Sequence, residues 1–268
     1  MILIKELVNK YLKLGNNYRN AQNLAAEEII LNKIASSSLS ESVTLKGGIV
    51  MYNLTKNNRR VTQDIDFDLI RYSIDETSIR LFIDKLSTLN DGITVLIKGP
   101  IEKLHQEDYQ GVRVNLLIKD TIGDSLRIKL DIGVHTYFAI EQEKTIFSFE
   151  SGERSISINV NPCEQIFAEK ILSLARLGPL STRYKDVYDL YYLIQNNLLN
   201  IEKVKVILNL FFIGSKRQPK SIIELTDSLV GTFENKNFLD DISEPAHKWL
   251  DVSSEDIKKV IIDFIDKL

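Results

Sequence analysis

A pair of glycines is followed, after a short helix-like segment, by aspartates that alternate with apolar residues. The glycines are Gly47 and Gly48, and the aspartates are Asp64, Asp66 and Asp68. Glycine has no Cβ, so the backbone at the pair can approach a phosphate closely. Residues two apart in a strand share a face, and crowded carboxylates repel one another unless a cation such as Mg²⁺ lies between them. The pattern predicts a site for a nucleoside triphosphate and its metal ions.

A third carboxylate occurs about 65 residues after Asp64, in another strand-like segment. Asp131 is flanked by Leu130 and Ile132, where an unpaired charge would be costly. Two acids from one strand and one from a neighbouring strand can hold two Mg²⁺ ions, which would orient a triphosphate and activate an attacking hydroxyl. The alternative is that Asp131 is a strand-end acid held in a salt bridge.

A lysine and an aspartate on two later helix-like segments are further candidates. Lys170 could direct a positive charge at triphosphate oxygens, and Asp186 could hold that lysine or accept a proton from the incoming hydroxyl. Asp189 lies close enough along the chain to exchange roles with Asp186. Considered by itself, a lysine–aspartate pair on neighbouring helices is also typical of a surface ion pair, which contributes little to stability.

The elements that must position these residues change character along the chain. Helix-like and strand-like patterns alternate up to about residue 160, and from Cys163 onward the pattern is almost wholly helical. We therefore expect two domains, 1–160 and 161–268. The expected helices are 4–36, 49–54 and 75–90, and the expected strands are 43–46 (or an approach to the next helix), 64–70, 93–97, 109–118, 126–134 and shorter pieces within 145–160.

The bulk composition indicates a soluble globular protein. The chain has 268 residues, of which 44% are hydrophobic and 26% charged. No apolar run approaches the roughly 20 residues that span a membrane, and the N-terminus lacks the features of a signal peptide. One cysteine excludes an intrachain disulfide, and three scattered histidines argue against a histidine-based metal cluster. We expect a cytoplasmic protein with no membrane segment.

The net charge of −3 limits how this chain can bind nucleic acid, because contact must then use local basic patches. Two basic segments, 56–60 and 216–220, are candidates, and each is more simply a solvated loop. Other residues also have simpler explanations than catalysis. His135 is expected to be a strand-end histidine with a satisfied hydrogen bond, and a helical stripe of Tyr184, Tyr188 and Tyr191 is expected to pack in the core.

Taken in order, the motifs resemble those of the AbiEii/AbiGii toxin family, which is related to the MenT toxins of type IV toxin–antitoxin and abortive-infection systems. The resemblance covers roughly residues 20–195. The matching segments are Lys46-Gly47-Gly48, Arg60-x-Thr62-x-Asp64-Ile65-Asp66-Phe67, Asp131, Ala168-Glu169-Lys170 and Lys185-Asp186-x-Tyr188-Asp189-Leu190.

The resemblance implies an α/β fold of the polymerase-β-like nucleotidyltransferase type, with a mixed sheet, and a helical C-terminal domain. It implies an enzyme that transfers a nucleotide from an NTP substrate, with Mg²⁺ or Mn²⁺ as cofactor. Related toxins modify the 3′ end of tRNA, which blocks aminoacylation and stops translation. Family members are usually neutralised by a separately encoded antitoxin, so both an RNA acceptor and an antitoxin are expected partners.

The resemblance also assigns roles to residues of this chain. Many nucleotidyltransferases have Gly-Ser where this chain has Gly-Gly, so no serine hydroxyl is available to the phosphates. The metal ligands are expected to be Asp64, Asp66 and Asp131, the other catalytic residues Lys170 and Asp186, and the nucleotide-binding residues Lys46, Gly47, Gly48, Thr62 and Lys170.

Two other functions would use the same residues. One is a small-molecule nucleotidyltransferase that modifies a hydroxylated compound such as an aminoglycoside, and the other is a non-catalytic NTP-binding or protein-interaction module. A broad basic surface beside the acids would favour RNA as the acceptor, whereas a closed acidic pocket would favour a cationic drug.

Overall fold

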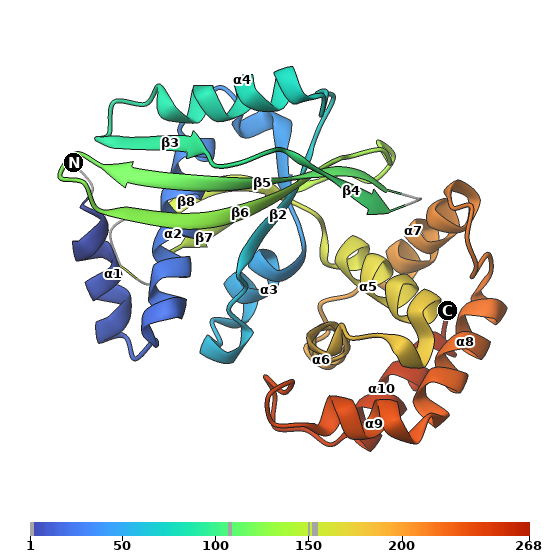
Figure 1. Cartoon of the computed structure of the whole chain (residues 1–268). Helices are drawn as coiled ribbons and strands as arrows, with labels where there is room; N and C mark the ends of the chain where they lie inside the picture. Colours follow the sequence, from blue (N-terminus) through green and yellow to red (C-terminus); the bar gives the residue numbers. More distant parts are fainter. Residues whose placement is uncertain (1–2, 107–108, 150, 152–154) are drawn as a thin grey trace. The chain divides into compact units, whose positions relative to one another are not determined.

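The computed structural model describes residues 3–106, 109–149, 151 and 155–268. The chain divides into two compact units, Met1–Asn161 and Pro162–Leu268. The first unit combines helices with a sheet, and the second is helical (Figure 1). The predicted α/β class with a mixed sheet is confirmed. Within the described residues, no helix is both long and apolar enough to cross a membrane.

The first unit is built on a mixed sheet with eight strands among the described residues (Figure 1). The strand order is β3-β5-β6-β2-β1-β8-β7, and β4 pairs with β5. β2 runs parallel to β6 and antiparallel to β1, and β1 runs parallel to β8. The strands are β1 Val43–Leu45, β2 Asp64–Leu69, β3 Ile93–Ile97, β4 Glu102–Gln106, β5 Tyr109–Asp120, β6 Ser125–Val134, β7 Glu143–Ser148 and β8 Ser155–Val160.

Alternation along the strands separates an apolar face of the sheet from a polar one. In β6, Leu130 and Ile132 are buried, whereas Lys129 is exposed. In β2, the buried Phe67 packs on Phe82 of α4, with 5.6 Å between ring centroids. α4 runs along β3 in Figure 1. The core of this unit therefore lies on the side of the sheet opposite the acids.

Helices of the first unit begin at polar caps. The side chain of Asn17 accepts a hydrogen bond from the Asn20 backbone N–H at the start of α2, and Asp75 accepts one from Ser78 at the start of α4. α1 and α2 pack together, and α2 also contacts β6 and β8. These helices are α1 Ile4–Lys13, α2 Tyr18–Ala35, α3 Gly47–Thr55 and α4 Glu76–Ser87, with short 3₁₀ turns at Ser40–Ser42 and Asn58–Arg60.

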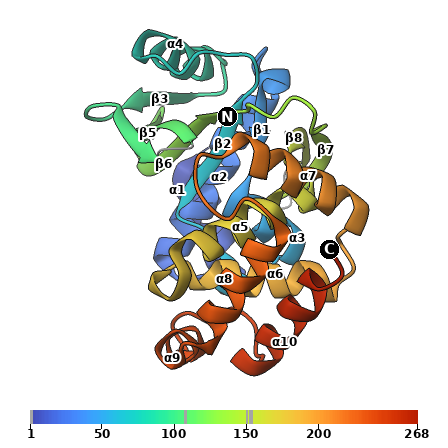
Figure 2. The same ribbon diagram turned by 90° about the vertical axis from the view of Figure 1, so that its right-hand side faces the viewer.

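The second unit packs around large aromatic side chains. Tyr188 is fully buried and its hydroxyl donates to the Ile242 carbonyl at 2.6 Å, and Phe167 packs on Phe264. α10 contacts α6 and α8 (Figure 2). The helices are α5 Cys163–Leu177, α6 Tyr184–Gln195, α7 Ile201–Gly214, α8 Ile222–Glu234, α9 Lys236–Ser243 and α10 Ser254–Ile265, with a 3₁₀ turn at Gly178–Leu180.

Several sequence expectations differ from the structure in detail. The expected helix 4–36 is two helices, α3 begins at the glycine pair, and β4 has no counterpart among the expected strands. The pieces within 145–160 belong to β7 and β8, and residues 150 and 152–154 lie outside the described residues. In the tyrosine stripe, Tyr188 is buried, but Tyr184 and Tyr191 are half-exposed, so only the middle member is a core residue.

The packing of α4 on the sheet can be tested with two neighbouring residues. Phe82→Ala should lower the free energy of unfolding by about 3–5 kcal/mol, because it leaves a cavity against Phe67. Leu81→Ala, on the same helix but 54% exposed, should change it by less than about 0.5 kcal/mol. Urea unfolding of both variants measures the difference, and equal losses would contradict the described orientation of α4.

Candidate functional site

The acids come together because β2 and β6 lie side by side in parallel. Asp66 is paired with Asp131, and Asp64 with Lys129. Paired residues on adjacent strands point to the same face and lie about 5 Å apart along the hydrogen-bonding direction. Asp64 and Asp66 lie two residues apart, so all three acids share one face of the sheet. The strand pairing thus places Asp131 next to Asp66, whereas the shared metal centre of the three acids stays a prediction.

Asp131 is engaged by an arginine from the neighbouring strand. Arg113 stands opposite Asp131 in β5, and its Nε and Nη2 donate to the two carboxylate oxygens at 2.7 and 2.6 Å. These hydrogen bonds raise the pKa of the Arg113 guanidinium, which stays charged. Arg113 is not among the residues predicted from sequence. Its alternation with Val112 and Val114 places it on the polar face, but its pairing with Asp131 depends on the register of two long strands.

Asp68 continues the row of acids but is buried and paired. The Lys46 ammonium lies 3.0 Å from Asp68 Oδ1, and both side chains are largely buried. Lys46 comes directly before the glycine pair, so this ion pair ties the start of α3 to β2. The predicted nucleotide-binding role of Lys46 stays a prediction.

The glycine pair lets the N-terminus of α3 touch the acid-bearing strand. Gly47 has φ +64°, and a Cβ at this position would lie 2.8 Å from Asp66 Oδ2. A Cβ on Gly48 would lie 2.9 Å from the Thr62 hydroxyl oxygen. Any side chain at either position would therefore push the helix away from β2. The first N–H groups of a helix lack intrahelical partners and favour anions, and this contact places them beside the Asp66 carboxylate.

The basic segment 56–60 is only partly a solvated loop. Lys56 and Arg59 are exposed, but Arg60 is buried, and its Nη1 lies 3.3 Å from the Cβ position of Gly48. The expectation of a solvated segment is therefore wrong for Arg60, which packs beneath the glycine pair. Thr62 donates from its hydroxyl to the Asp64 carbonyl at 3.2 Å. Arg60 and Thr62 thus support the start of α3 and the start of β2.

The number and exposure of the acids decide whether they can serve as ligands for Mg²⁺. Mg²⁺ is often held by one or two carboxylates together with phosphate oxygens and water. Asp64 and Asp66, partly exposed beside a helix N-terminus, fit this requirement. Across the described residues, no three His, Cys, Asp or Glu side chains gather closely enough to hold a metal. The Asp131 carboxylate is instead paired with Arg113. Asp131 as the third ligand stays a prediction.

In the second unit, Lys170 lies between two carboxylates. Its ammonium hydrogen-bonds to Asp186 and lies 2.9 Å from Asp189 Oδ2. The side chains are 6%, 13% and 0% exposed, in the order Lys170, Asp186, Asp189. Arg183 Nε approaches the other Asp186 oxygen at 2.8 Å. The alternative of a surface ion pair is therefore wrong, and both aspartates hold the lysine.

His135 lies just past the end of β6 and is buried. Burial lowers the pKa of its imidazole, and the charge of Asp68 and hydrogen bonds with the backbone at Tyr137 and Ile140 oppose that shift only in part. Its ring packs edge-on against Phe138, with 5.8 Å between centroids. The expectation of a strand-end histidine with satisfied hydrogen bonds is confirmed.

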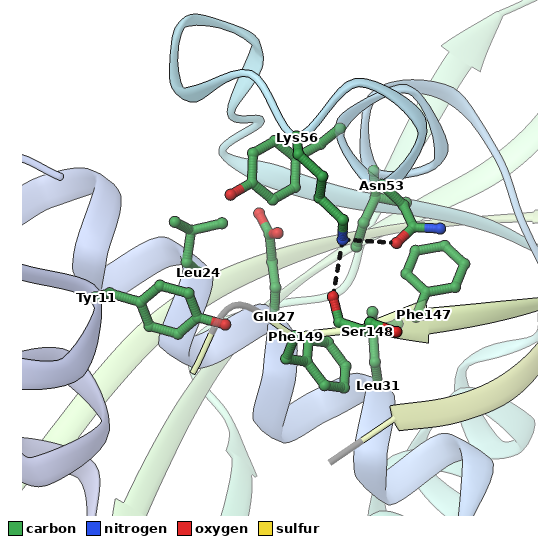
Figure 3. Close-up of a pocket in the computed structure, with 11 residues that line it drawn as sticks. Tyr11, Leu24, Glu27, Leu31, Asn53, Lys56, Phe147, Ser148 and Phe149 are labelled. Carbon is green, nitrogen blue, oxygen red and sulfur yellow. Dashed lines mark hydrogen bonds between the residues drawn. The ribbon is translucent and has the colours of Figure 1, made fainter. Parts of the chain in front are cut away.

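A small cavity next to α3 contains a buried acid. Glu27 of α2 lines this cavity, whereas Lys56 turns to the Asn53 side chain and the Ser148 carbonyl (Figure 3). Burial, and then the charge of Asp64, raise the pKa of the Glu27 carboxyl well above its ordinary value. Within the described part of the chain, Glu27 Oε1 has no hydrogen-bond partner. The cavity of about 20 Å³ has room for about one water molecule and excludes a nucleotide.

A wider groove of about 220 Å³ opens beside Asp64. We call it the cationic groove, because four basic side chains line it together with three amide side chains. Asp64 is its single carboxylate among the described lining residues. The basic residues are Arg19, Lys98, Arg127 and Lys129, and the amides are Asn23, Gln63 and Asn115.

The close contact at Gly47 predicts a matched pair of variants. Gly47→Ala and Gly99→Ala both place a Cβ at positive φ, which costs about 1–2 kcal/mol. Only Gly47→Ala also presses on Asp66, so it should lose about 1–3 kcal/mol more. Urea unfolding measures both losses, and equal values would contradict the tight contact between α3 and β2.

The buried lysine predicts a second pair of variants. Lys170→Met should lower the free energy of unfolding by about 3–5 kcal/mol, because it removes the ammonium from the fully buried Asp189 and leaves Asp186 with Arg183. Lys259→Met, at an exposed position of α10, should change it by less than about 0.5 kcal/mol. Thermal or urea unfolding tests this, and a small effect of Lys170→Met would show that the cluster is well hydrated.

Comparison with known proteins assigns the chain to a family. A family model described as "Nucleotidyl transferase AbiEii toxin, Type IV TA system" matches residues 29–262. No curated protein sequence matches the chain. The crystal structure of an antigenic nucleotidyltransferase-like protein from Paracoccidioides brasiliensis is similar at 17% sequence identity, with a TM-score of 0.44, over 82% of this chain and 91% of that chain. Because the family model spans most of its length, the chain belongs to the AbiEii nucleotidyltransferase toxin family of type IV toxin–antitoxin systems.

Proposed function

We propose that this protein uses Mg²⁺ to transfer a nucleotide from an NTP to RNA, with the 3′ end of tRNA as the acceptor, and thereby inhibits translation. The observation that carries the proposal is the contact of the α3 N-terminus with Asp66 through Gly47. A helix N-terminus binds phosphate, and carboxylates bind the metal that accompanies a triphosphate. Both groups occur at one place in this unit.

Each residue has a role in this proposal. Asp64 and Asp66 would hold Mg²⁺, which when bound neutralises the triphosphate and stabilises the departing pyrophosphate. The N–H groups of Gly47 and Gly48 would bind phosphate oxygens, and Thr62 would hold the neighbouring backbone in place. The expected binding of phosphate by Lys170 stays a prediction, and within the second unit its two carboxylate partners restrict the position of the ammonium.

Asp131 requires a change of partner before it can act as a third ligand or accept a proton. Its two oxygens both accept hydrogen bonds from Arg113. A metal ion or a proton would therefore have to compete with the guanidinium for these oxygens. We propose that Arg113 turns away from Asp131 when nucleotide and metal bind, and that its charge then faces the substrate.

The charge beside the acids favours an anionic acceptor over a cationic one. The cationic groove adjoins Asp64, and it would repel an aminoglycoside, which carries several positive charges. A small-molecule nucleotidyltransferase for such compounds is therefore the weaker candidate. Membership of a type IV toxin–antitoxin family also supports a separately encoded antitoxin as the partner that neutralises this protein.

The proposal predicts that label from α-³²P-NTPs enters RNA. Wild-type protein, Mg²⁺ and total tRNA should yield labelled tRNA, and EDTA should abolish labelling. Asp64→Asn/Asp66→Asn should reduce the rate at least about a hundredfold, because the carboxylates supply several kcal/mol through the metal. Asp84→Asn, at an exposed site on α4, should label RNA like the wild type.

Three outcomes would contradict the proposal. They are no label on RNA with any NTP, full labelling by the double variant, and labelling of an aminoglycoside in preference to RNA. Expression in bacteria separates catalysis from simple binding. If the double variant still arrests growth as the wild type does, the toxic action is non-catalytic.

A further inference from the structure

The charge of the side chains on the polar face of the sheet changes from negative to positive next to Asp64. Asp64 of β2 is paired with Lys129 of β6, and Lys129 with Asn115 of β5. Lys98 continues this row, since its backbone N–H donates to the Asn115 carbonyl at 2.8 Å. Arg127 lies two residues before Lys129 and therefore shares its face. A row of side chains thus crosses neighbouring strands from one carboxylate to several cations.

The cations of this row are available for a ligand. Lys98, Arg127 and Lys129 are exposed, and none of them forms an ion pair with another described residue. Basic side chains elsewhere near the acids are already paired, as Lys46 is with Asp68 and Arg113 is with Asp131. In a chain of net charge −3, an uncompensated basic patch of this kind indicates an anionic ligand.

Besides the two apolar residues Leu116 and Ile128, the remaining lining residues offer hydrogen bonds. Asn23, Gln63 and Asn115 carry amides, which both donate and accept, as the ribose hydroxyls and base edges of RNA do. The Asn23 amide nitrogen is buried and has no hydrogen-bond partner among the described residues. Arg19 is held at the rim, where its Nη2 donates to Gln63 Oε1 at 2.6 Å. This lining suits a sugar–phosphate chain better than the apolar face of a protein helix.

We propose that the cationic groove binds the single-stranded end of the RNA acceptor and leads its terminal hydroxyl to Asp64. The inference rests on the proposed function, because it names the surface that holds the acceptor of that reaction. Arg127, Lys129 and Lys98 contact phosphates, and the amides contact sugars and bases. Asp64, the acid that is expected to hold the metal, lines the groove, so a strand lying in it passes beside that carboxylate.

A binding assay without nucleotide tests this inference. A fluorescein-labelled oligouridylate is titrated with the full chain in EDTA over a range of salt concentrations, and anisotropy is recorded. Arg127→Gln/Lys129→Gln is compared with Lys13→Gln/Lys85→Gln, which removes the same charge from exposed positions at the ends of α1 and α4. The groove variant should bind about fivefold to tenfold more weakly. The slope of log affinity against log salt concentration should become shallower by about 1.4, which is about 0.7 for each phosphate that the protein no longer neutralises.

The control variant should match the wild type in affinity and slope, and circular dichroism confirms that both variants fold. Equal binding by the groove variant, or no binding by the wild type, would overturn the inference. Competition by polyglutamate as strong as that by RNA would also overturn it, since the groove would then accept acidic protein segments. The binding assay does not measure nucleotide transfer, so a negative result leaves the proposed function standing. RNA binding that depends on the groove, together with no nucleotide transfer to RNA, would support the role of the groove and count against the proposed reaction.

Discussion

The pairing of β2 with β6 is the constraint on which the site depends. These strands come from segments about 60 residues apart, and their parallel register sets Asp66 beside Asp131 and Asp64 beside Lys129. Strands have a period of two, so a slip of one residue would turn the acids into the core and Phe67 out of it. The burial of Phe67 and its neighbours against α4 therefore fixes the position of the carboxylates.

The structure compensates two of the four charges in the row of acids individually. Asp68 is paired with Lys46 and Asp131 with Arg113. The compensation decreases toward the start of β2, where Asp64 meets the cationic groove. Along this face, ion pairs thus give way to the exposed basic side chains that line the groove.

Local patterns predicted the elements well and the interactions between them poorly. The acid strand, the helix after the glycines and the three strands 93–97, 109–118 and 126–134 all follow from alternation and turn residues, which are local properties. The Arg113–Asp131 pair and the burial of Arg60 depend on strand register and on helix packing, which no local window contains. The Lys170 cluster was located by motif, but its burial, which decides between a surface pair and a fixed charge, required the packing of α5 and α6.

The contact between Gly48 and Thr62 has a consequence for how such sites can vary. The hydroxyl oxygen of Thr62 lies 2.9 Å from the point where a Cβ on Gly48 would stand, so the two positions compete for one volume. A serine after the first glycine, as in many nucleotidyltransferases, would need a smaller residue than threonine across from it. The residues at the two positions should therefore covary among relatives. A larger residue at position 48 should leave stability unchanged only when position 62 already has a smaller side chain. In this chain the hydroxyl next to the helix N-terminus comes from the strand side, and the helix itself contributes only backbone.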